Sequence, residues 1–116
     1  MLREMLIGKL HRGTVTACRI DYEGSLTVDA DLIDAAGMLV HQKVQVLDIS
    51  NGERIETYLI PGERGRREMQ VNGAAARLFY QGDRVIVCAY GLLDERECAS
   101  LKPKVVLLDE KNRVVG

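Results

Sequence analysis

Short segments of alternating apolar and polar residues, separated by glycine turns, are the feature that most constrains the fold of this chain. Residues 43–50 (KVQVLDIS) begin with strict alternation, and Asn51-Gly52 follows at once. This dipeptide is a strong β-hairpin signal, so residues 54–60 are expected to form the return strand, ended by Pro61-Gly62. Leu47 departs from the alternation, which indicates either burial on both faces or a bulge. The period of two favours strands over helices.

Three further strands are expected outside this hairpin. Residues 14–22 alternate, and residues 104–108 form a short final run. Residues 84–90 (RVIVCAY) are almost entirely apolar, which is typical of a central strand, and they follow a Gly82-Asp83 turn. Six or seven short strands with brief helices between them favour a compact all-β barrel over a parallel α/β sheet.

The expected helices are few and short. Asp29 or Asp31 is suited to cap a turn that ends near Ala36, with Gly37 in the left-handed conformation. Two more helices are expected: residues 73–80, capped by Asn72 and closed by Gly82, and residues 94–100, which are amphipathic at best.

Length and composition narrow the functional classes. A chain of 116 residues is expected to form one domain. The net charge of −1, the five aromatic residues and the absence of tryptophan argue against a nucleic-acid partner. No apolar run reaches membrane-spanning length, and the N-terminal segment lacks the apolar core of a signal peptide, so a cytoplasmic protein is expected. The three cysteines form no CxxC pair, which predicts reduced, largely buried thiols and no metal site.

Gly24-Ser25 is the first candidate for chemistry. The pair lies between two strand-like segments, and a tight turn is the ordinary interpretation. The alternative is self-cleavage, in which the serine hydroxyl attacks the carbonyl of the preceding residue and exchanges the amide for an ester. A glycine before the serine removes side-chain bulk and tolerates the strained backbone that this attack requires.

Other candidates are weak individually. Asn72 and the small residues after it form either a plain helix start or a backbone surface that a carboxylate can approach. Arg54 and Tyr58 share one face of their expected strand, and Thr57 projects from the other. Such an arginine is usually a solvated charge, but in a dry site it can bind a carboxylate with two hydrogen bonds. Lys9 and His11 also share a face, as either a polar strand surface or a functional pair.

Taken together and in order, these signals resemble the bacterial pyruvoyl-dependent aspartate 1-decarboxylases from end to end. The resemblance implies a double-psi β-barrel, consistent with the expected strands, and a homotetramer of processed protomers with four α and four β chains. The matching segments are Met5–Arg12, Tyr22–Ser25, Asp34–Gly37, Asn51-Gly52, Thr57-Tyr58, Glu63–Gly65, Val71–Ala76 and Gly82-Asp83.

The resemblance also implies a mechanism. Ser25 attacks the Gly24 carbonyl, and the chain splits into a β chain of residues 1–24 and an α chain of residues 25–116 whose first residue is a pyruvoyl group. This covalent cofactor forms a Schiff base with L-aspartate and promotes loss of CO₂, giving β-alanine for pantothenate and coenzyme A synthesis. No metal and no pyridoxal phosphate is expected, because a protein-derived ketone supplies the electrophile.

The resemblance carries roles to individual residues. Tyr58 corresponds to the proton donor, and Thr57 to a residue that assists processing and contacts substrate. Arg54 and Lys9 are candidates for the substrate carboxylates, His11 for orienting or shuttling protons, and Asn72 for a hydrogen bond near the reacting centre. The backbone that lines the substrate pocket is expected to come from Gly73, Ala74 and Ala75.

Some points depart from the family or stay open. Phe79 and Tyr80 stand where smaller or more polar residues are expected, and the tail after Val106 matches no motif. An accessory maturation factor is possible under the resemblance. Two other functions remain: a non-catalytic β-barrel that binds a peptide or protein, and a self-cleaving hydrolase whose new N-terminal residue is the nucleophile.

Overall fold

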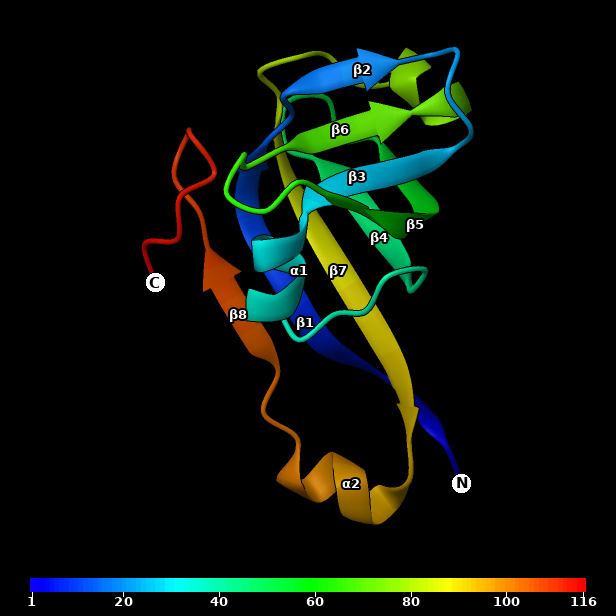
Figure 1. Cartoon of the computed structure of the whole chain (residues 1–116). Coiled ribbons are helices and arrows are strands. Elements are labelled where there is room, and N and C mark those ends of the chain that lie inside the picture. Colours follow the sequence, from blue (N-terminus) through cyan, green and yellow to red (C-terminus); the bar gives the residue numbers. More distant parts are fainter.

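A computed structural model describes residues 1–116 and shows an all-β fold with two short α-helices and one 3₁₀ helix (Figure 1). The molecule is elongated, with extents of 42 × 28 × 25 Å. The strands are β1 (Arg3–Thr14), β2 (Ala17–Arg19), β3 (Ser25–Asp29), β4 (Lys43–Asp48), β5 (Arg54–Gly62), β6 (Met69–Asn72), β7 (Arg84–Leu93) and β8 (Lys104–Leu107). The helices are α1 (Ala30–Ala35), the 3₁₀ helix η1 (Gly73–Arg77) and α2 (Glu95–Ser100).

The eight strands form one mixed sheet in the order β2-β6-β3-β5-β4-β7-β1-β8. Three pairs are parallel, namely β1 with β8, β2 with β6, and β3 with β5. In Figure 1, β2, β6 and β3 lie side by side at the top, and β1 and β7 run the length of the molecule toward α2. The sheet curls as in a double-psi β-barrel, but β2 and β8 do not pair, so the barrel is not closed.

The core consists of the inward-facing residues of the strands, sealed by α1 and by Phe79 after η1. Alternation produces this core in β4, where Val44 and Val46 are buried and their neighbours are not. All five residues of β3 are buried, so this strand is covered on both faces. The largest fully buried side chains are Phe79, Leu10, Leu26, Ile33, Leu59 and Met69.

Several expected elements are confirmed. The hairpin joins β4 and β5 antiparallel around Asn51-Gly52, with Gly52 at φ +78°, and β7 pairs with two neighbours as a central strand. Asp29 caps α1, and Gly37 follows it at φ +68°. A capping box at Asp94 starts α2. Leu47 is half-buried without a bulge, so both faces of β4 are partly covered.

Other expectations are wrong. Residues 14–22 do not form one strand: β1 ends at Thr14, and only Ala17–Arg19 pair again, with β6. Val15 and Thr16 instead donate backbone hydrogen bonds to the carbonyls of Asp83 and Met69, so the chain changes partners there. The strand β6 was not expected, and β1 and β3 were expected only in part, as a polar strand surface at Lys9 and His11 and as a strand-like segment after Gly24. The predicted helix 73–80 is only the short 3₁₀ helix η1.

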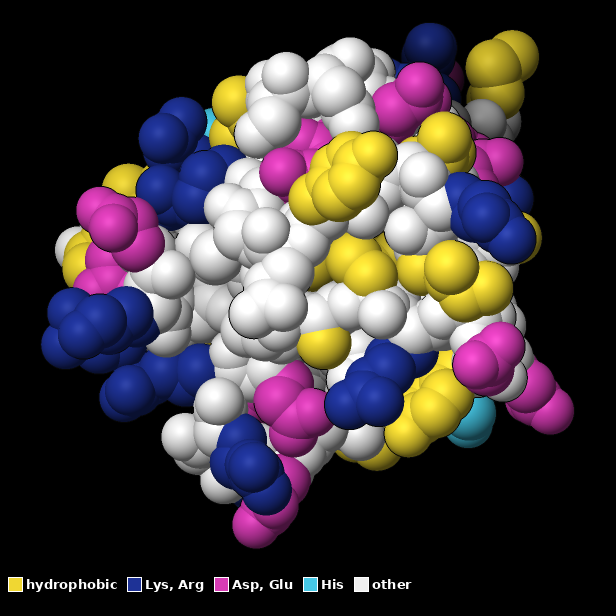
Figure 2. Space-filling view, turned by 90° about the horizontal axis from the view of Figure 1, so that it is seen from above, with side chains coloured by type: hydrophobic (Ala, Val, Ile, Leu, Met, Phe, Trp, Pro, Cys, Tyr) yellow, Lys and Arg dark blue, Asp and Glu magenta, His cyan; other side chains and the backbone are white.

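The surface mixes charge and apolar groups. Viewed from above, hydrophobic side chains lie in patches between separate groups of basic and acidic residues (Figure 2). Exposed hydrophobic residues that flank β2 and η1 are Ile20, Tyr22, Leu78 and Tyr80. Neither α-helix has the length and apolar character that a membrane span requires.

Candidate functional site

Ser25 is the first residue of β3 and is only 3% exposed, although Gly24 before it is exposed. Its hydroxyl donates a hydrogen bond to the Glu23 carbonyl at 3.1 Å. The same Oγ accepts a hydrogen bond from Asn72 Nδ2 at 3.0 Å. The serine is therefore buried, hydrogen-bonded on both sides and directly preceded by an exposed glycine, an arrangement that a plain surface turn does not require.

Asn72 organises this buried polar group. It is fully buried at the end of β6, directly opposite Ser25 in the antiparallel pair of β3 and β6. Besides Ser25, its amide donates to Thr27 Oγ1 at 2.9 Å, and its Oδ1 accepts from Gln70 Nε2 at 2.7 Å. The expectation that Asn72 caps the following helix is wrong, because its side chain makes no capping bond to η1 and is occupied by these contacts instead.

Thr27 and Gln70 are members of the site that sequence reasoning missed. They are paired across β3 and β6, two residues along from the Ser25–Asn72 pair, and thus lie on the same face. The available signal was the alternation of Ser25 and Thr27 with apolar residues in a segment of strong β character. The partner strand, which completes the group, cannot be read from that segment.

Gly73 brings the backbone of η1 against the cleavage candidate. A Cβ atom at Gly73 would lie 2.6 Å from Gly24 Cα and 2.8 Å from Gly24 N, and the residue has φ +73°. Both facts require glycine here. Ala74 is exposed and Ala75 half-buried on the same 3₁₀ helix. Of the expected pocket-lining backbone, Gly73 is therefore the part that the structure brings to Gly24.

Thr57 and Tyr58 lie at the same end of the β3–β5 pair as Gly24 and Ser25. The first registered pair of these parallel strands is Leu26 with Leu59. Gly24-Ser25 directly precede this pair on one strand, and Thr57-Tyr58 directly precede it on the other. Thr57 is half-buried opposite the core residue Val44. Tyr58 points to the other face, as alternation requires, and is 37% exposed.

The remaining candidates share that other face, which we call the outer face of β5, β4, β7 and β1. His11 and Arg54 lie in one row across the sheet, through Ile86 and Leu47. Lys9 lies in the adjacent row. No hydrogen bond or ion pair joins Ser25 to Lys9, His11, Arg54 or Tyr58, so the predicted residues form two groups in one chain.

His11 is the outer-face candidate whose pKa is shifted by its surroundings. Its Nδ1 is buried and has no hydrogen-bond partner. Burial, followed by the charges of Lys9, Arg12 and Arg84, lowers the pKa of the imidazole below its ordinary value. The ring is therefore neutral at neutral pH and has an unoccupied nitrogen.

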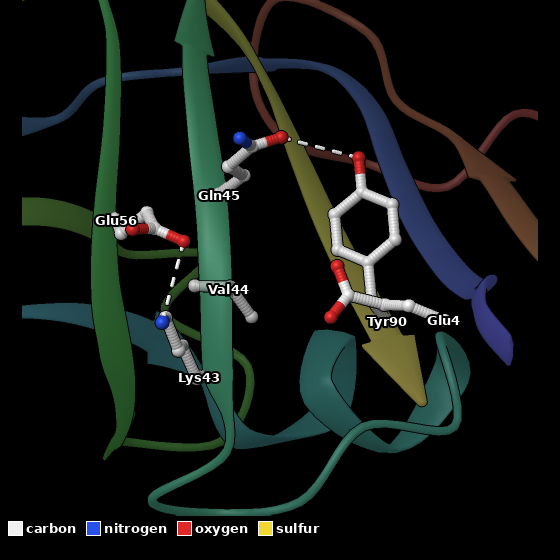
Figure 3. Close-up of a pocket in the computed structure, with 6 residues that line it drawn as sticks. All are labelled: Glu4, Lys43, Val44, Gln45, Glu56 and Tyr90. Carbon is white, nitrogen blue, oxygen red and sulfur yellow. Dashed lines mark hydrogen bonds and ion pairs between the residues drawn. The ribbon is translucent and has the colours of Figure 1, made fainter. Parts of the chain in front are cut away.

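A cavity of about 340 Å³ opens on the same outer face (Figure 3). Four of its polar side chains are paired: Lys43 and Glu56 are 3.3 Å apart, and Tyr90 Oη donates to Gln45 Oε1 at 3.1 Å. Burial and Cys88 raise the pKa of Tyr90, and Arg54 opposes this rise. Sequence reasoning missed these residues, although Glu56 shares strand parity with Arg54 and Tyr58. The cavity is lined by Glu4, Lys43, Val44, Gln45, Glu56 and Tyr90.

The cysteines are free: Cys88 is buried, and Cys18 and Cys98 are half-buried. No three His, Cys, Asp or Glu side chains gather closely enough to hold a metal ion.

Comparison with known proteins gives a consistent result over the whole chain. Residues 1–115 match the model of a family described as aspartate decarboxylase. The aspartate 1-decarboxylase of Bacillus subtilis (strain 168) is 51% identical over 114 residues, which cover 98% of this chain and 90% of that protein. The protein of the same name from Wolinella succinogenes is 54% identical over 112 residues, covering 97% of this chain and 93% of its own.

Proposed function

The chain belongs to the aspartate decarboxylase family of carboxy-lyases, and on this premise we propose that it converts L-aspartate to β-alanine and CO₂ with a pyruvoyl group made from its own Ser25. The observation that carries the proposal is the buried Ser25 hydroxyl, hydrogen-bonded to Asn72 and attached to an exposed Gly24 that packs against Gly73. The domain of residues 1–116 would then function as a β chain, 1–24, and an α chain, 25–116.

The first step is maturation of the chain itself. Ser25 Oγ attacks the Gly24 carbonyl carbon, the Gly24–Ser25 C–N bond breaks, and an ester with a free amine results. Elimination then removes the Cα proton and breaks the Cβ–Oγ bond, leaving a Gly24 carboxylate and a dehydroalanine terminus. Water hydrolyses the imine tautomer of that terminus and releases ammonia, so the ketone forms without an external oxidant.

The residues around Ser25 suit both the attack and the product. Asn72 Nδ2, already 3.0 Å from Oγ, remains a donor for the oxygen atoms that form there. Thr57 lies at the same end of the β3–β5 pair as Gly24, which supports a role for the Thr57 hydroxyl in polarising the Gly24 carbonyl. Gly73 leaves no room for a side chain between η1 and Gly24, so water and substrate meet backbone there.

When formed, the group supplies an electrophilic ketone that withdraws the electron pair left as CO₂ departs. The chain's own residues would do the rest. Arg54 and Lys9 bind the two carboxylates of aspartate by charge-assisted hydrogen bonds. Tyr58 Oη donates a proton to the substrate Cα after decarboxylation. His11, neutral because its pKa is lowered, orients the substrate and accepts or returns protons at Nδ1.

The proposal includes assembly and cellular context. Because Ser25 and the outer-face residues form two groups in one chain, the proposal includes a homotetramer in which a neighbouring copy brings its outer face to Ser25. Exposed hydrophobic residues on and beside that face, Tyr58, Tyr90, Val105 and Leu107, suit such an interface. A cytoplasmic location, supply of β-alanine for pantothenate, and help from an accessory maturation factor are parts of the same proposal.

Mass spectrometry under denaturing conditions tests the proposal directly. Active protein should separate into residues 1–24 and 25–116, and the larger fragment should react with a hydrazine. Ser25→Ala should abolish cleavage and CO₂ release, whereas Ser100→Ala, at a serine outside the site, should retain both. A single unmodified chain in active protein would overturn the proposal, and a fragment that begins with a free serine amine would favour a hydrolase.

A further inference from the structure

Asp48 is a buried carboxyl side chain for which the proposed reaction has no use. It ends β4, is 2% exposed, and has one carboxylate oxygen engaged: Oδ1 accepts from the Ser50 amide at 2.8 Å. Its Oδ2 is buried and has no donor. An ionised carboxylate with a dry, unpaired oxygen is costly, so the structure requires a proton or a donor at Oδ2.

The strand β7 brings another carboxyl close to Asp48, because Asp48 pairs with Val85 and the Ile49 amide donates to the Arg84 carbonyl at 2.9 Å. Asp83, in the turn before β7, interacts side chain to side chain with Asp48. Asp83 Oδ2 also accepts from the Tyr80 amide at 3.0 Å. The thiol of Cys18, on β2, is the further titratable group in this cluster, and its pKa is raised by burial and by both carboxyls. None of the groups that shift the pKa of Asp48 is basic.

The two carboxyls join two loops. Asp48 shapes the β4–β5 hairpin turn, and Asn51 of that turn donates from Nδ2 to the Leu78 carbonyl at 2.9 Å. Asp83 holds the segment that follows η1, through the Tyr80 amide. Leu78 is the residue that closes η1, since its amide donates to Ala75 at 3.0 Å. The position of η1 thus depends on contact between the hairpin and the Asp83 turn.

We propose that Asp48 and Asp83 share one proton, donated from Asp48 Oδ2 to an Asp83 carboxylate oxygen, and that this proton fastens the hairpin to the segment that positions η1. Two carboxylates in contact without a cation cannot both be ionised cheaply. In agreement, burial and the Asp83 side chain raise the pKa of Asp48 to about 6. Loss of the proton leaves two like charges between the loops and loosens them.

A consequence for catalysis rests on the proposed function, in which η1 presents Gly73 to the reacting centre. Asp48 and Asp83 are then positioning residues that touch no substrate. As the pH rises through about 6, the wild-type KM for aspartate should increase more than kcat falls. Asp48→Asn carries a permanent donor at this position, so its KM should lack this dependence.

Carbon-detected NMR of labelled aspartate side chains tests the shared proton in the unprocessed Ser25→Ala chain, where activity plays no part. One carboxyl carbon of the pair should titrate near pH 6, and this transition should vanish in Asp48→Asn. Titration of both groups near the ordinary aspartate pKa of about 3.9 would overturn the proposal.

Thermal unfolding gives a second test. In the wild type, stability should fall between about pH 4 and pH 6, because the unfolded chain ionises Asp48 before the folded chain does. Asp48→Asn should raise Tm by roughly 5–10 °C above pH 6 and leave it unchanged near pH 4. Asp83→Asn should behave similarly, and Glu110→Gln, an exposed control, should follow the wild type. Parallel wild-type and Asp48→Asn profiles would overturn the proposal.

The two proposals fail separately. If the chain with Asp48 intact shows no NMR transition near pH 6, and its stability profile matches that of Asp48→Asn, the shared proton is overturned even if aspartate is decarboxylated. Conversely, if these signatures are present but the wild-type chain, with Ser25 intact, never cleaves, the pyruvoyl mechanism alone is overturned. A pH-independent wild-type KM, with the NMR transition present, would overturn the positioning role.

Discussion

At the scale of single residues, the contact between Gly73 and Gly24 is the tightest constraint on the site. Glycine is needed at positions 73 and 24 for different reasons. Gly73 has φ +73° and would place a Cβ 2.6 Å from Gly24 Cα, whereas a Cβ on Gly24 would meet nothing within 4 Å. The folded chain therefore needs glycine at 73, and only the strained attack by Ser25 needs it at 24.

Substitution separates these requirements. Gly73→Ala should lower the free energy of unfolding by roughly 2–3 kcal/mol, through positive φ and displacement of Gly24, and should also prevent cleavage. Gly24→Ala should keep the wild-type unfolding midpoint in urea and slow cleavage alone. Denaturation curves and fragment masses measured on the same samples check both effects. Equal destabilisation by the two substitutions would contradict this account.

Which residues belong to the site could be predicted from the sequence better than which contacts those residues make. Ser25 stands out locally because it follows glycine between strand-like segments. Asn72 resembles a helix cap just as strongly, since it precedes glycine and three alanines. Its actual partners, Ser25 and Thr27, lie more than forty residues away in the sequence. Cross-strand pairing decides that choice, and no single segment encodes its own partner strand.

At the scale of elements, the C-terminal turn is fastened to the barrel by one side chain. Asn112 is 1% exposed; its Oδ1 accepts from the Thr14 amide at 2.6 Å, and its Nδ2 donates to the carbonyls of Thr14 and Arg67 at 2.9 and 3.0 Å. It has φ +58°, a conformation that asparagine tolerates better than most residues. The turn after β8 is thereby connected to β1 and to the loop before β6.

Asn112→Ala should cost about 3 kcal/mol of unfolding free energy, because it removes three hydrogen bonds and places alanine at positive φ. Asn112→Gly removes the same bonds without backbone strain and should cost roughly 1 kcal/mol less. Urea titration of both variants separates the contributions. A wild-type midpoint for Asn112→Gly would show that the hydrogen bonds do not stabilise the fold.

Elements with local signals were predicted well, and those that depend on distant partners were not. The hairpin at Asn51-Gly52, the cap at Asp29 and the apolar β7 carry their information within a few residues. The twelve-residue β1 does not, because it has register irregularities where it pairs with β7, between Leu6 and Gly8 and between His11 and Gly13. These interruptions break the period of two that sequence reasoning follows.

At the scale of the whole molecule, the separation of Ser25 from the outer face predicts that function requires association. Light scattering of processed protein should give four times the mass of one chain. Dilution below the dissociation range should reduce activity per chain, while circular dichroism stays unchanged, because each chain retains its core but loses its neighbour's outer face. Full activity in a species of single-chain mass would contradict the tetramer.

The place of β1 in the sheet determines what a break after Gly24 does to the molecule. β1 lies between β7 and β8 and is hydrogen-bonded to both. The fragment of residues 1–24 would therefore hold an internal strand, and it cannot depart without exposing Leu10 and the core around it. Cleavage would therefore create two new chain ends, but the two fragments would stay associated in one folded unit. Such a break would leave the fold intact, and the new terminus at residue 25 would keep its position in the folded chain.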